Sequence, residues 1–335
     1  MRQTIKNISV IGDGGWGTTL AIHLAHKKYA VTLWGPFPDY IQLLKEQREN
    51  IKFLPEIPMP DNLNLSDDLS AVIPSAELIV FAIPSKYALK VLNQIQNTRV
   101  DLDKKIFLSV TKGIDVHSLQ TLSRMAKDVL GPLPIAVLSG PTIAMEVARG
   151  IPSSAVIASN PVSIAKNLQH VFHSTCLRIY TNTDVKGVEI GGSLKNIMAL
   201  ACGVCDGLGF GTNTKSALLT RSLAEMARLG KALGAQQKTF SGLSGLGDLV
   251  TTCFSPHSRN RSVGERIGKG EKIKDILRSM EMVAEGVDTA KSVYQLSQQL
   301  NISMPVTEQV YKIIYQNKSP HQAVSDLMTR KVKAE

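Results

Sequence analysis

The chain has 335 residues, a formal charge of +10 at pH 7, and 43% hydrophobic against 20% charged residues. This composition is typical of a globular protein of about two domains, and we find neither a leader-like segment nor an apolar run of the roughly 18 residues that a membrane span needs. The basic residues are dispersed and no nucleic-acid-binding motif stands out. We therefore expect a cytoplasmic protein with small anionic ligands, without nucleic acid and without stable membrane insertion.

The four cysteines do not form a pattern that indicates a metal or redox site. Cys202 and Cys205 form a CxxC, but the surrounding residues have helical spacing, and no second pair completes a zinc site. No HExxH motif or carboxylate cluster is present either. We expect buried thiols and no metal.

From residue 7 to about residue 182, short apolar runs alternate with segments of helical spacing. The strand-like runs cover 7–12, 30–35, 77–84, 105–113, 134–141, 153–160 and 176–182, and helical segments include 16–28, 39–50, 87–96 and 119–130. Nearly continuous apolar strands indicate a sheet that is covered on both faces, and alternation with helices indicates βαβ units. The sequence thus predicts an α/β, Rossmann-like, doubly wound sheet.

After about residue 184 the strand signal stops. The remaining segments have helical spacing and are separated by glycine, and they cover 187–204, 214–233, 259–270, 272–280, 287–300 and 306–317. We predict two domains, a dinucleotide-binding domain over 1–188 and an all-helical substrate and catalytic domain over 189–335. The boundary is a change of period rather than a linker.

A glycine-rich loop follows the first predicted strand. Gly12, Gly14 and Gly17 have the spacing that lets a backbone approach a dinucleotide pyrophosphate, and a predicted helix starts directly after them. The N–H groups at that helix start would bind the phosphates. The alternative interpretation is a glycine-rich turn that binds nothing.

The end of the second predicted strand carries no acid. NAD-specific folds usually place Asp or Glu there, to bind the ribose. Here Trp34, Gly35 and Pro36 occupy the position, and Asp39 comes too late. With no carboxylate to repel a 2′-phosphate the sequence favours NADPH, but no arginine attracts that phosphate, so NADP(H) and NAD(H) both stay open.

Two lysines are candidates for chemistry. Lys112 follows a predicted strand, at the sheet edge where doubly wound folds bind ligands, although it could equally be a solvated loop lysine. Lys195 lies in a predicted helix whose neighbouring positions on the same face are small or apolar. We expect it to point into packed structure, where desolvation lowers the pKa of a lysine towards the range useful for proton transfer; the alternative is a lysine that extends to solvent at a helix edge.

A third candidate stretch covers 245–268. Ser258 is a possible N-cap for a helix that begins with Arg259 and Asn260, and such a helix start suits a phosphate, although it could also be a basic cap in solvent. Asp248 lies nearby in the sequence, where its carboxylate could orient a catalytic lysine.

Taken together, these segments resemble one enzyme family. GDGGWGTTLA, SVTKG, LSGPT, GGSLKN, GLGDLVTTC, HSRNR and VAEG occur in the order found in bacterial-type NAD(P)-dependent glycerol-3-phosphate dehydrogenases, from about residue 7 to residue 328. The resemblance implies a Rossmann-like domain, a helical domain and a site between them. It also implies a cytosolic homodimer that reversibly reduces dihydroxyacetone phosphate to sn-glycerol 3-phosphate for glycerophospholipid synthesis.

The resemblance also assigns residues to roles. Lys195 matches the proton donor and acceptor, and Lys112 and Asp248 match catalytic residues at the reacting end of the substrate. The matching substrate-binding residues are Lys112, Gly140, Thr142, Lys195, Asn196, Asp248, Thr252, Ser258, Arg259 and Asn260. The matching cofactor-binding residues are Gly12, Gly14, Gly15, Trp16, Gly17, Pro36, Lys112, Ala144, Arg259, Val283 and Glu285.

Two departures from the family pattern concern the cofactor. The loop often has Ser where this chain has Gly15, and a basic residue often stands where this chain has Pro36. The alternatives to the predicted activity are a related two-domain hydroxyacid dehydrogenase and a non-catalytic regulator that senses NADPH. Neither explains HSRNR beside GLGDL together with a lysine on an apolar helix face.

Overall fold

The computed structural model describes residues 5–280 and 282–332, which divide into two compact units. Among these residues, unit 1 comprises 5–112 and 120–189, and unit 2 comprises 113–119 and the residues from Ile190 onward. The short segment Gly113–Leu119 belongs to unit 2 because Ile114 lies in the apolar core of that unit, where its carbonyl accepts a hydrogen bond from Ser292.

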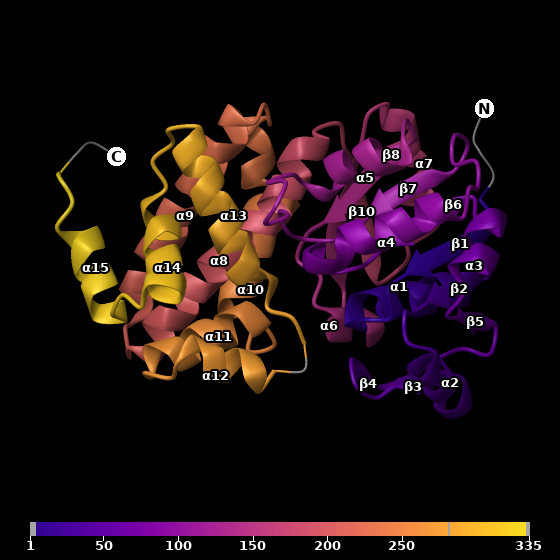
Figure 1. The fold of residues 1–335 in the computed structure, drawn as a ribbon, viewed down its shortest axis with the longest axis horizontal. Helices are drawn as coiled ribbons and strands as arrows, with labels where there is room; N and C mark the ends of the chain where they lie inside the picture. Colours follow the sequence, from indigo (N-terminus) through magenta and orange to yellow (C-terminus); the bar gives the residue numbers. More distant parts are fainter. Residues whose placement is uncertain (1–4, 281, 333–335) are drawn as a thin grey trace. The chain divides into compact units, whose positions relative to one another are not determined.

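Unit 1 is built on an eight-stranded sheet of order β10-β9-β8-β7-β6-β1-β2-β5 (Figure 1). Neighbouring strands are parallel except β8 and β9, so β9 and β10 run opposite to the other six. The strands are β1 (Asn7–Ile11), β2 (Ala30–Trp34), β5 (Leu63–Ser66), β6 (Leu78–Phe81), β7 (Ile106–Ser109), β8 (Ile135–Ser139), β9 (Ser153–Ser159) and β10 (Leu177–Asn182).

Apolar side chains cover both faces of this sheet. Leu78 and Val80 of β6 lie in one core cluster, whereas Ile79 and Phe81 of the same strand lie in a second cluster, because successive side chains of a strand point to opposite faces. The helices of the unit are α1 (Gly15–His26), α2 (Pro38–Gln47), α3 (Leu69–Ser75), α4 (Ser85–Asn97), α5 (Leu122–Leu130), α6 (Ala144–Ala148) and α7 (Val162–Phe172). The predicted Rossmann-like fold is confirmed.

Three strands are absent from the sequence prediction. The edge strand β5 has the sequence LNLS, which is too short and too polar to stand out. The helical spacing predicts a helix that continues to residue 50. In the structure, α2 ends at Gln47 and is followed by a small hairpin of β3 (Glu49–Asn50) and β4 (Leu54–Pro58). This hairpin places Asn50 against the glycine loop, as described below.

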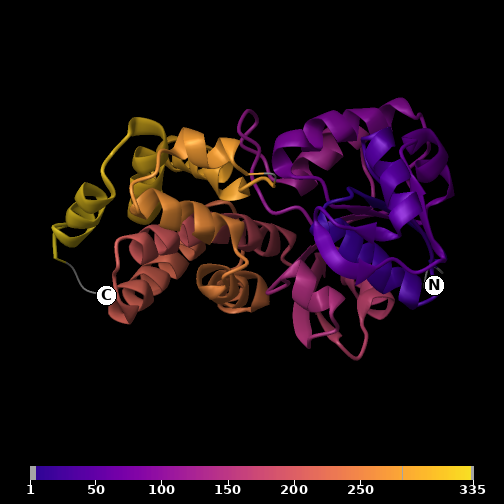
Figure 2. The same ribbon diagram turned by 90° about the horizontal axis from the view of Figure 1, so that it is seen from below.

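From Ile190 onward, the described residues of unit 2 form helices joined by turns and loops, whereas its segment 113–119 is not helical. After α8 (Val185–Gly207) come α9 (Thr212–Ala232), a 3-10 turn η1 (Gln237–Ser241), a π-helical turn η2 (Leu243–Gly247), α10 (Asp248–Phe254), α11 (Arg259–Gly268), α12 (Ile273–Arg278), α13 (Glu285–Gln299), α14 (Pro305–Gln316) and α15 (Pro320–Met328). Figures 1 and 2 both show α14 beside α13, with α15 following it. The predicted helical second half is confirmed.

One described helix, α8, is long and apolar enough to cross a membrane by length and composition alone. Its most apolar stretch is entirely buried within the protein. The core helix of a globular protein has the same properties, so α8 is weak evidence for a membrane span.

Candidate active site

The glycine loop joins β1 to α1, and glycine is present at each of its positions for a different structural reason. Gly12 has a φ of +122°, and a Cβ there would come within 2.8 Å of the Ala82 carbonyl oxygen. A Cβ on Gly17 would overlap the Gly12 carbonyl oxygen, so only glycine lets α1 pack this closely. Gly14 is the N-cap of α1 without a side-chain hydrogen bond, and nothing lies within 4 Å of the position of a Cβ. The loop therefore fits a pyrophosphate, which would face the helix N-terminus.

The neighbouring positions explain one departure from the family pattern. A side chain on Gly15 would come within 2.6 Å of the Phe53 carbonyl oxygen, which accounts for glycine instead of serine. Ala144 begins α6 directly against α1, where its carbonyl accepts a hydrogen bond from Thr19 at 3.2 Å. The indole Nε1 of Trp16 is buried without a hydrogen-bond partner among the described residues.

The end of β2 differs from the sequence prediction. Pro36 is exposed and follows Gly35, as expected. However, the side chain of Asp13 lies against Gly35, and a Cβ on Gly35 would overlap its carboxyl group. The prediction that no carboxylate stands at this strand end was wrong, because the acid comes from the glycine loop and not from β2.

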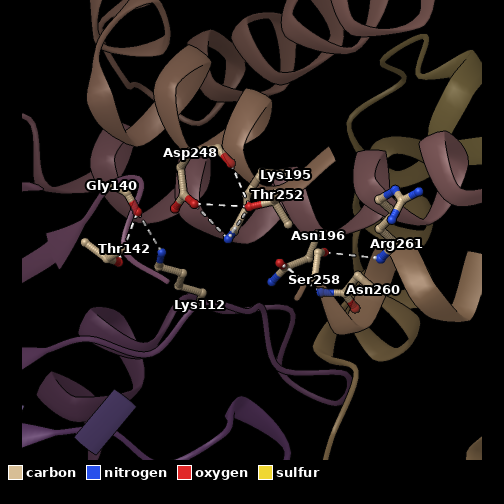
Figure 3. Close-up of polar contacts among 10 residues, drawn as sticks. All are labelled: Lys112, Gly140, Thr142, Lys195, Asn196, Asp248, Thr252, Ser258, Asn260 and Arg261. Carbon is tan, nitrogen blue, oxygen red and sulfur yellow. Dashed lines mark hydrogen bonds and ion pairs between the residues drawn. The ribbon is translucent and has the colours of Figure 1, made fainter. Parts of the chain in front are cut away.

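Lys112 lies just beyond β7, and its side chain is half-buried (Figure 3). Its Nζ donates a hydrogen bond to the carbonyl of Gly140 at 3.1 Å, and the Thr142 hydroxyl donates to the same carbonyl at 3.1 Å. Gly140 follows β8 with a φ of +144°. The carboxyl-end loops of two neighbouring strands thus bring together the three predicted substrate-binding residues of unit 1, at the edge where doubly wound sheets bind ligands.

Lys195 lies on α8 and is buried, as the apolar face of that helix predicts, with 7% of its surface exposed. Its Nζ lies 2.8 Å from Asp248 Oδ1 and donates a hydrogen bond to the Thr252 hydroxyl at 2.7 Å (Figure 3). Thr252 in turn donates to the carbonyl of Asp248, at 2.6 Å. The structure therefore unites Lys195 with two residues more than 50 positions away, and the carboxylate holds the lysine in one orientation.

The position of Asp248 depends on an irregular backbone. The π-helical turn η2 directly precedes α10, of which Asp248 is the first residue. A Cβ on Gly191 of α8 would come within 2.5 Å of the Ser244 carbonyl oxygen, so α8 and η2 are in backbone contact. π-Helical turns are frequent at functional sites, and this one brings the carboxylate of Asp248 to Lys195.

The N-terminus of α11 carries the predicted phosphate-binding residues. Ser258 is the N-cap, and its hydroxyl accepts a hydrogen bond from the Arg261 N–H at 3.3 Å. Asn260 is buried; its amide donates to Asn196 Oδ1 at 3.0 Å and accepts from the Gly286 N–H at 2.9 Å (Figure 3). Asn196 follows Lys195 on α8, so these hydrogen bonds join the helix start to the helix that carries the lysine.

Arg259 is the exposed residue of this run. Its Nη1 donates a hydrogen bond to the carbonyl of Val283 at 2.9 Å. This hydrogen bond places Val283, and with it Glu285 at the start of α13, near the α11 N-terminus. The resemblance predicts a shared cofactor-binding role for these residues. The exposed guanidinium remains available to an anion.

The residues that hold these elements in place are not among those predicted from the sequence. Glycines on α8 and α11 let the two backbones touch: a Cβ on Gly203 would overlap the Arg261 carbonyl, and a Cβ on Gly264 would overlap the Leu200 carbonyl. Asp206 of α8 accepts a hydrogen bond from Arg261 Nε at 2.7 Å and lies 2.8 Å from the ammonium of Lys215. The i, i+4 glycine spacing was the available signal for the helix contact, whereas no local pattern points to Asp206.

The cysteines are unpaired thiols, and Cys202, Cys205 and Cys253 are buried as predicted. Burial raises the pKa of Cys205 to about 12. Cys176 is only partly buried, so the prediction was wrong for that residue. Among residues 5–280 and 282–332, no group of three or more His, Cys, Asp or Glu side chains could hold a metal ion.

Comparison with known proteins shows which family the chain resembles. Residues 7–165 match the model of the NAD-dependent glycerol-3-phosphate dehydrogenase N-terminus, and residues 184–325 match that of the C-terminus. Proteins named NAD(P)+ glycerol-3-phosphate dehydrogenase from Prosthecochloris aestuarii and Citrifermentans bemidjiense are each 46% identical over 98% of this chain and 99% of their own length.

The fold comparison agrees. The crystal structure of glycerol-3-phosphate dehydrogenase from Coxiella burnetii is 37% identical and superposes with a TM-score of 0.94, covering 97% of this chain and 99% of that one. The yeast glycerol-3-phosphate dehydrogenase GPD1 is 28% identical, with a TM-score of 0.82 over 98% of this chain and 100% of that chain. Both halves of the chain match the models of one family. The chain belongs to the NAD-dependent glycerol-3-phosphate dehydrogenases.

Proposed function

We propose that this protein reduces dihydroxyacetone phosphate to sn-glycerol 3-phosphate with NAD(P)H, reversibly, and so supplies the backbone of glycerophospholipids. The dinucleotide binds to unit 1 at the Gly12–Gly17 loop, and unit 2 provides the proton donor and the phosphate site. The observation that carries the proposal is the buried Lys195, held by Asp248 and Thr252 on the helix that also carries Asn196.

Lys195 has the surroundings of a proton donor. A carboxylate 2.8 Å from its Nζ favours the charged ammonium, which keeps a proton ready for the carbonyl oxygen of a ketone. Thr252 restricts the rotamers of the lysine further. When bound, the reduced nicotinamide supplies the hydride for the carbonyl carbon.

Lys112 has a separate task. The negative charge that grows on the carbonyl oxygen during reduction is stabilised best by a cation that is already oriented. The hydrogen bond from Lys112 to Gly140 holds its ammonium in a defined place at the sheet edge. We therefore assign Lys112 to charge stabilisation and substrate orientation, and Thr142 to the same substrate-binding loop.

The phosphate of the substrate binds at the N-terminus of α11. Ser258, Arg259 and Asn260 surround a helix start whose N–H groups and dipole favour an anion. Binding energy from this non-reacting phosphate positions the ketone, so a substrate without phosphate loses kcat/KM even though its carbonyl is unchanged.

A substrate panel tests the proposed reaction. Purified protein should oxidise NADH or NADPH with dihydroxyacetone phosphate, and chromatography should identify sn-glycerol 3-phosphate as the product. Unphosphorylated dihydroxyacetone and 3-oxoacids should react more slowly by orders of magnitude, about a hundredfold or more. If the protein oxidises NADH or NADPH with a 3-oxoacid but not with dihydroxyacetone phosphate, it is a hydroxyacid dehydrogenase. If it binds the nucleotide without turning over any substrate of the panel, it is a regulator.

We propose further that the enzyme is a cytoplasmic homodimer without stable membrane insertion, which the resemblance to the family supports. Sedimentation equilibrium of the purified protein should give twice the chain mass of 36.4 kDa. A monomeric mass at assay concentrations would contradict the dimer. Fractionation of cells that express the protein should recover it with the soluble enzymes; recovery in washed membranes would contradict the assigned location.

A further inference from the structure

The carboxyl group of Asp13 is buried in the glycine loop, and the proposed reaction gives it no role. The residue is 9% exposed, and its Oδ2 atom has no hydrogen-bond partner among the described residues. It is not a helix cap either, because Gly14 is the N-cap of α1 and no side chain caps that helix start. A buried acceptor that the fold leaves unpaired is unfavourable unless something binds to it.

This carboxyl group lies at the end of β2. The Gly12 N–H donates to the Trp34 carbonyl at 2.9 Å, which joins the start of the loop to the last residue of the strand. A Cβ on Gly35, the next residue, would overlap both Oδ2 and Cγ of Asp13. Glycine at position 35 therefore leaves the space that the side chain of Asp13 occupies.

The backbone of Asp13 is held from a distant part of the chain. Its carbonyl accepts hydrogen bonds from Asn50 Nδ2 at 2.8 Å and from the Thr18 hydroxyl at 3.2 Å. Asn50 is completely buried, and its side chain also bonds to Thr18 and to the Tyr40 hydroxyl. These hydrogen bonds fix the backbone from which the side chain of Asp13 extends against Gly35.

The end of the second strand is where dinucleotide-binding folds recognise the adenosine ribose, usually with an acid on the strand itself. This chain has no acid on β2 or directly after it. Instead, the glycine loop places the carboxyl group of Asp13 against Gly35, the residue that follows β2. We propose that Asp13 is the nucleotide-specificity residue of this enzyme: it accepts a hydrogen bond from the ribose 2′-hydroxyl of NADH and repels the 2′-phosphate of NADPH. The inference rests on the proposed function only in taking the glycine loop as the dinucleotide site.

The charge of Asp13 supports this assignment. Burial raises the pKa of its carboxyl group to about 6, while its own backbone N–H and the positive charge of Lys52 act in the opposite direction. The group is therefore mostly ionised above neutral pH, where it both accepts from a hydroxyl and repels a phosphate. The proposal reverses the preference for NADPH that the sequence favours, because the acid that the strand lacks is provided by the loop.

Direct binding tests the proposal without turnover. Calorimetric titration of the substrate-free protein at a mildly alkaline pH should give a dissociation constant for NADH at least about tenfold below that for NADPH. Asp13→Asn keeps the shape and removes the charge, so it should tighten NADPH by about tenfold and weaken NADH by only a few-fold. Asp39→Asn, which changes an exposed carboxylate on α2 nearby in the sequence, should leave both constants unchanged.

Each result decides the question. Equal or tighter NADPH binding by the wild-type protein overturns the proposal, and this measurement needs no variant that has to fold. An unchanged ratio in a folded Asp13→Asn variant, verified by thermal unfolding, overturns it as well. Tight and selective NADH binding without any reduction of dihydroxyacetone phosphate would contradict the proposed function and leave the role of Asp13 intact.

Discussion

At the scale of single residues, the residues proposed for proton transfer differ in burial and charge pairing from the arginine proposed for phosphate binding. Lys195 and Asp248 form a buried ion pair, whereas Arg259 is exposed and donates a hydrogen bond to the backbone carbonyl of Val283. Removing one partner of a buried pair leaves an uncompensated charge, and removing an exposed cation does not. The two kinds of residue should therefore respond to substitution in different ways.

Arg259→Ala should mainly weaken substrate binding. The substitution removes a cation beside the α11 N-terminus and leaves the Lys195 cluster unchanged, so KM for dihydroxyacetone phosphate should rise by about tenfold to a hundredfold with a much smaller change in kcat. Steady-state kinetics measure the split. Arg278→Ala, an exposed arginine on α12, is the matched control. An unchanged KM for Arg259→Ala would contradict the phosphate assignment.

Asp248→Asn should mainly reduce kcat. The amide keeps the size of the side chain but removes the charge that favours the ammonium of Lys195. We expect kcat to fall by about a hundredfold, with nucleotide affinity unchanged, since no contact of the glycine loop is altered. Kinetics together with nucleotide titration provide the comparison. A variant with wild-type kcat would show that Asp248 has only a structural role.

At the scale of elements, the contact between α8 and α11 brings the N-terminus of α11, the proposed phosphate site, towards the helix that carries Lys195. Glycine backbones allow this contact, because larger residues at the crossing would separate the helices. Asn260 and Asn196 hydrogen-bond across the same pair of helices. The distance between Lys195 and the proposed phosphate-binding residues is thus set by the packing of two helices.

Gly264→Ala tests this packing. Its Cβ would overlap the Leu200 carbonyl, so we expect a loss of about 1–3 kcal/mol in the free energy of unfolding and a raised KM. Denaturant unfolding and kinetics are the two readouts. Gly211→Ala is the control, since nothing lies within 4 Å of the position of its Cβ and its φ is −84°. Equal stabilities of the two variants would refute the close-packed contact.

Glu225 gives unit 2 a pH dependence. This buried carboxyl group of α9 accepts N–H bonds from Val306 and Thr307 at the start of α14, and burial raises its pKa from 4.5 to about 7. The folded protein binds the extra proton between these values, so the free energy of unfolding falls as pH rises across that window, by up to about 3 kcal/mol for this group.

The variant Glu225→Gln cannot titrate at this position. Its thermal unfolding temperature should therefore change less between about pH 5 and about pH 8 than that of the wild-type protein. Other carboxyl groups contribute equally to both proteins, so the difference between them isolates Glu225. The same change in both would mean that Glu225 titrates as it does in the unfolded chain.

At the scale of the whole molecule, the regular strands and helices could be predicted from the sequence, whereas contacts between residues far apart in the chain could not. Periodicity predicts the buried strands and long helices because burial repeats every two or 3.6 residues along them. It also predicts that Lys195 is buried, since its helix neighbours are apolar. The edge strand β5 and the hairpin at Asn50 lack this repeat, and their places depend on contacts with residues far away in the chain.

The candidate site shows the same division. Local patterns single out the glycine loop, Lys195, Asp248 and the run from Ser258 to Asn260 as candidates, and the resemblance assigns their roles. The role of Gly35 could not be read from its own position, because the side chain that fills its space belongs to Asp13. Asp206 likewise holds Arg261 from 55 residues away.

In the proposed reaction, Lys195 supplies the proton for reduction of dihydroxyacetone phosphate. The most direct measurement is kcat of Lys195→Ala with saturating nucleotide and substrate, beside Lys231→Ala, which removes an exposed lysine of α9 in the same unit. We predict a loss of about a hundredfold to ten-thousandfold for Lys195→Ala, with nucleotide binding retained, and none for the control. Near-wild-type turnover by a folded Lys195→Ala variant would contradict the role of Lys195 as the proton donor.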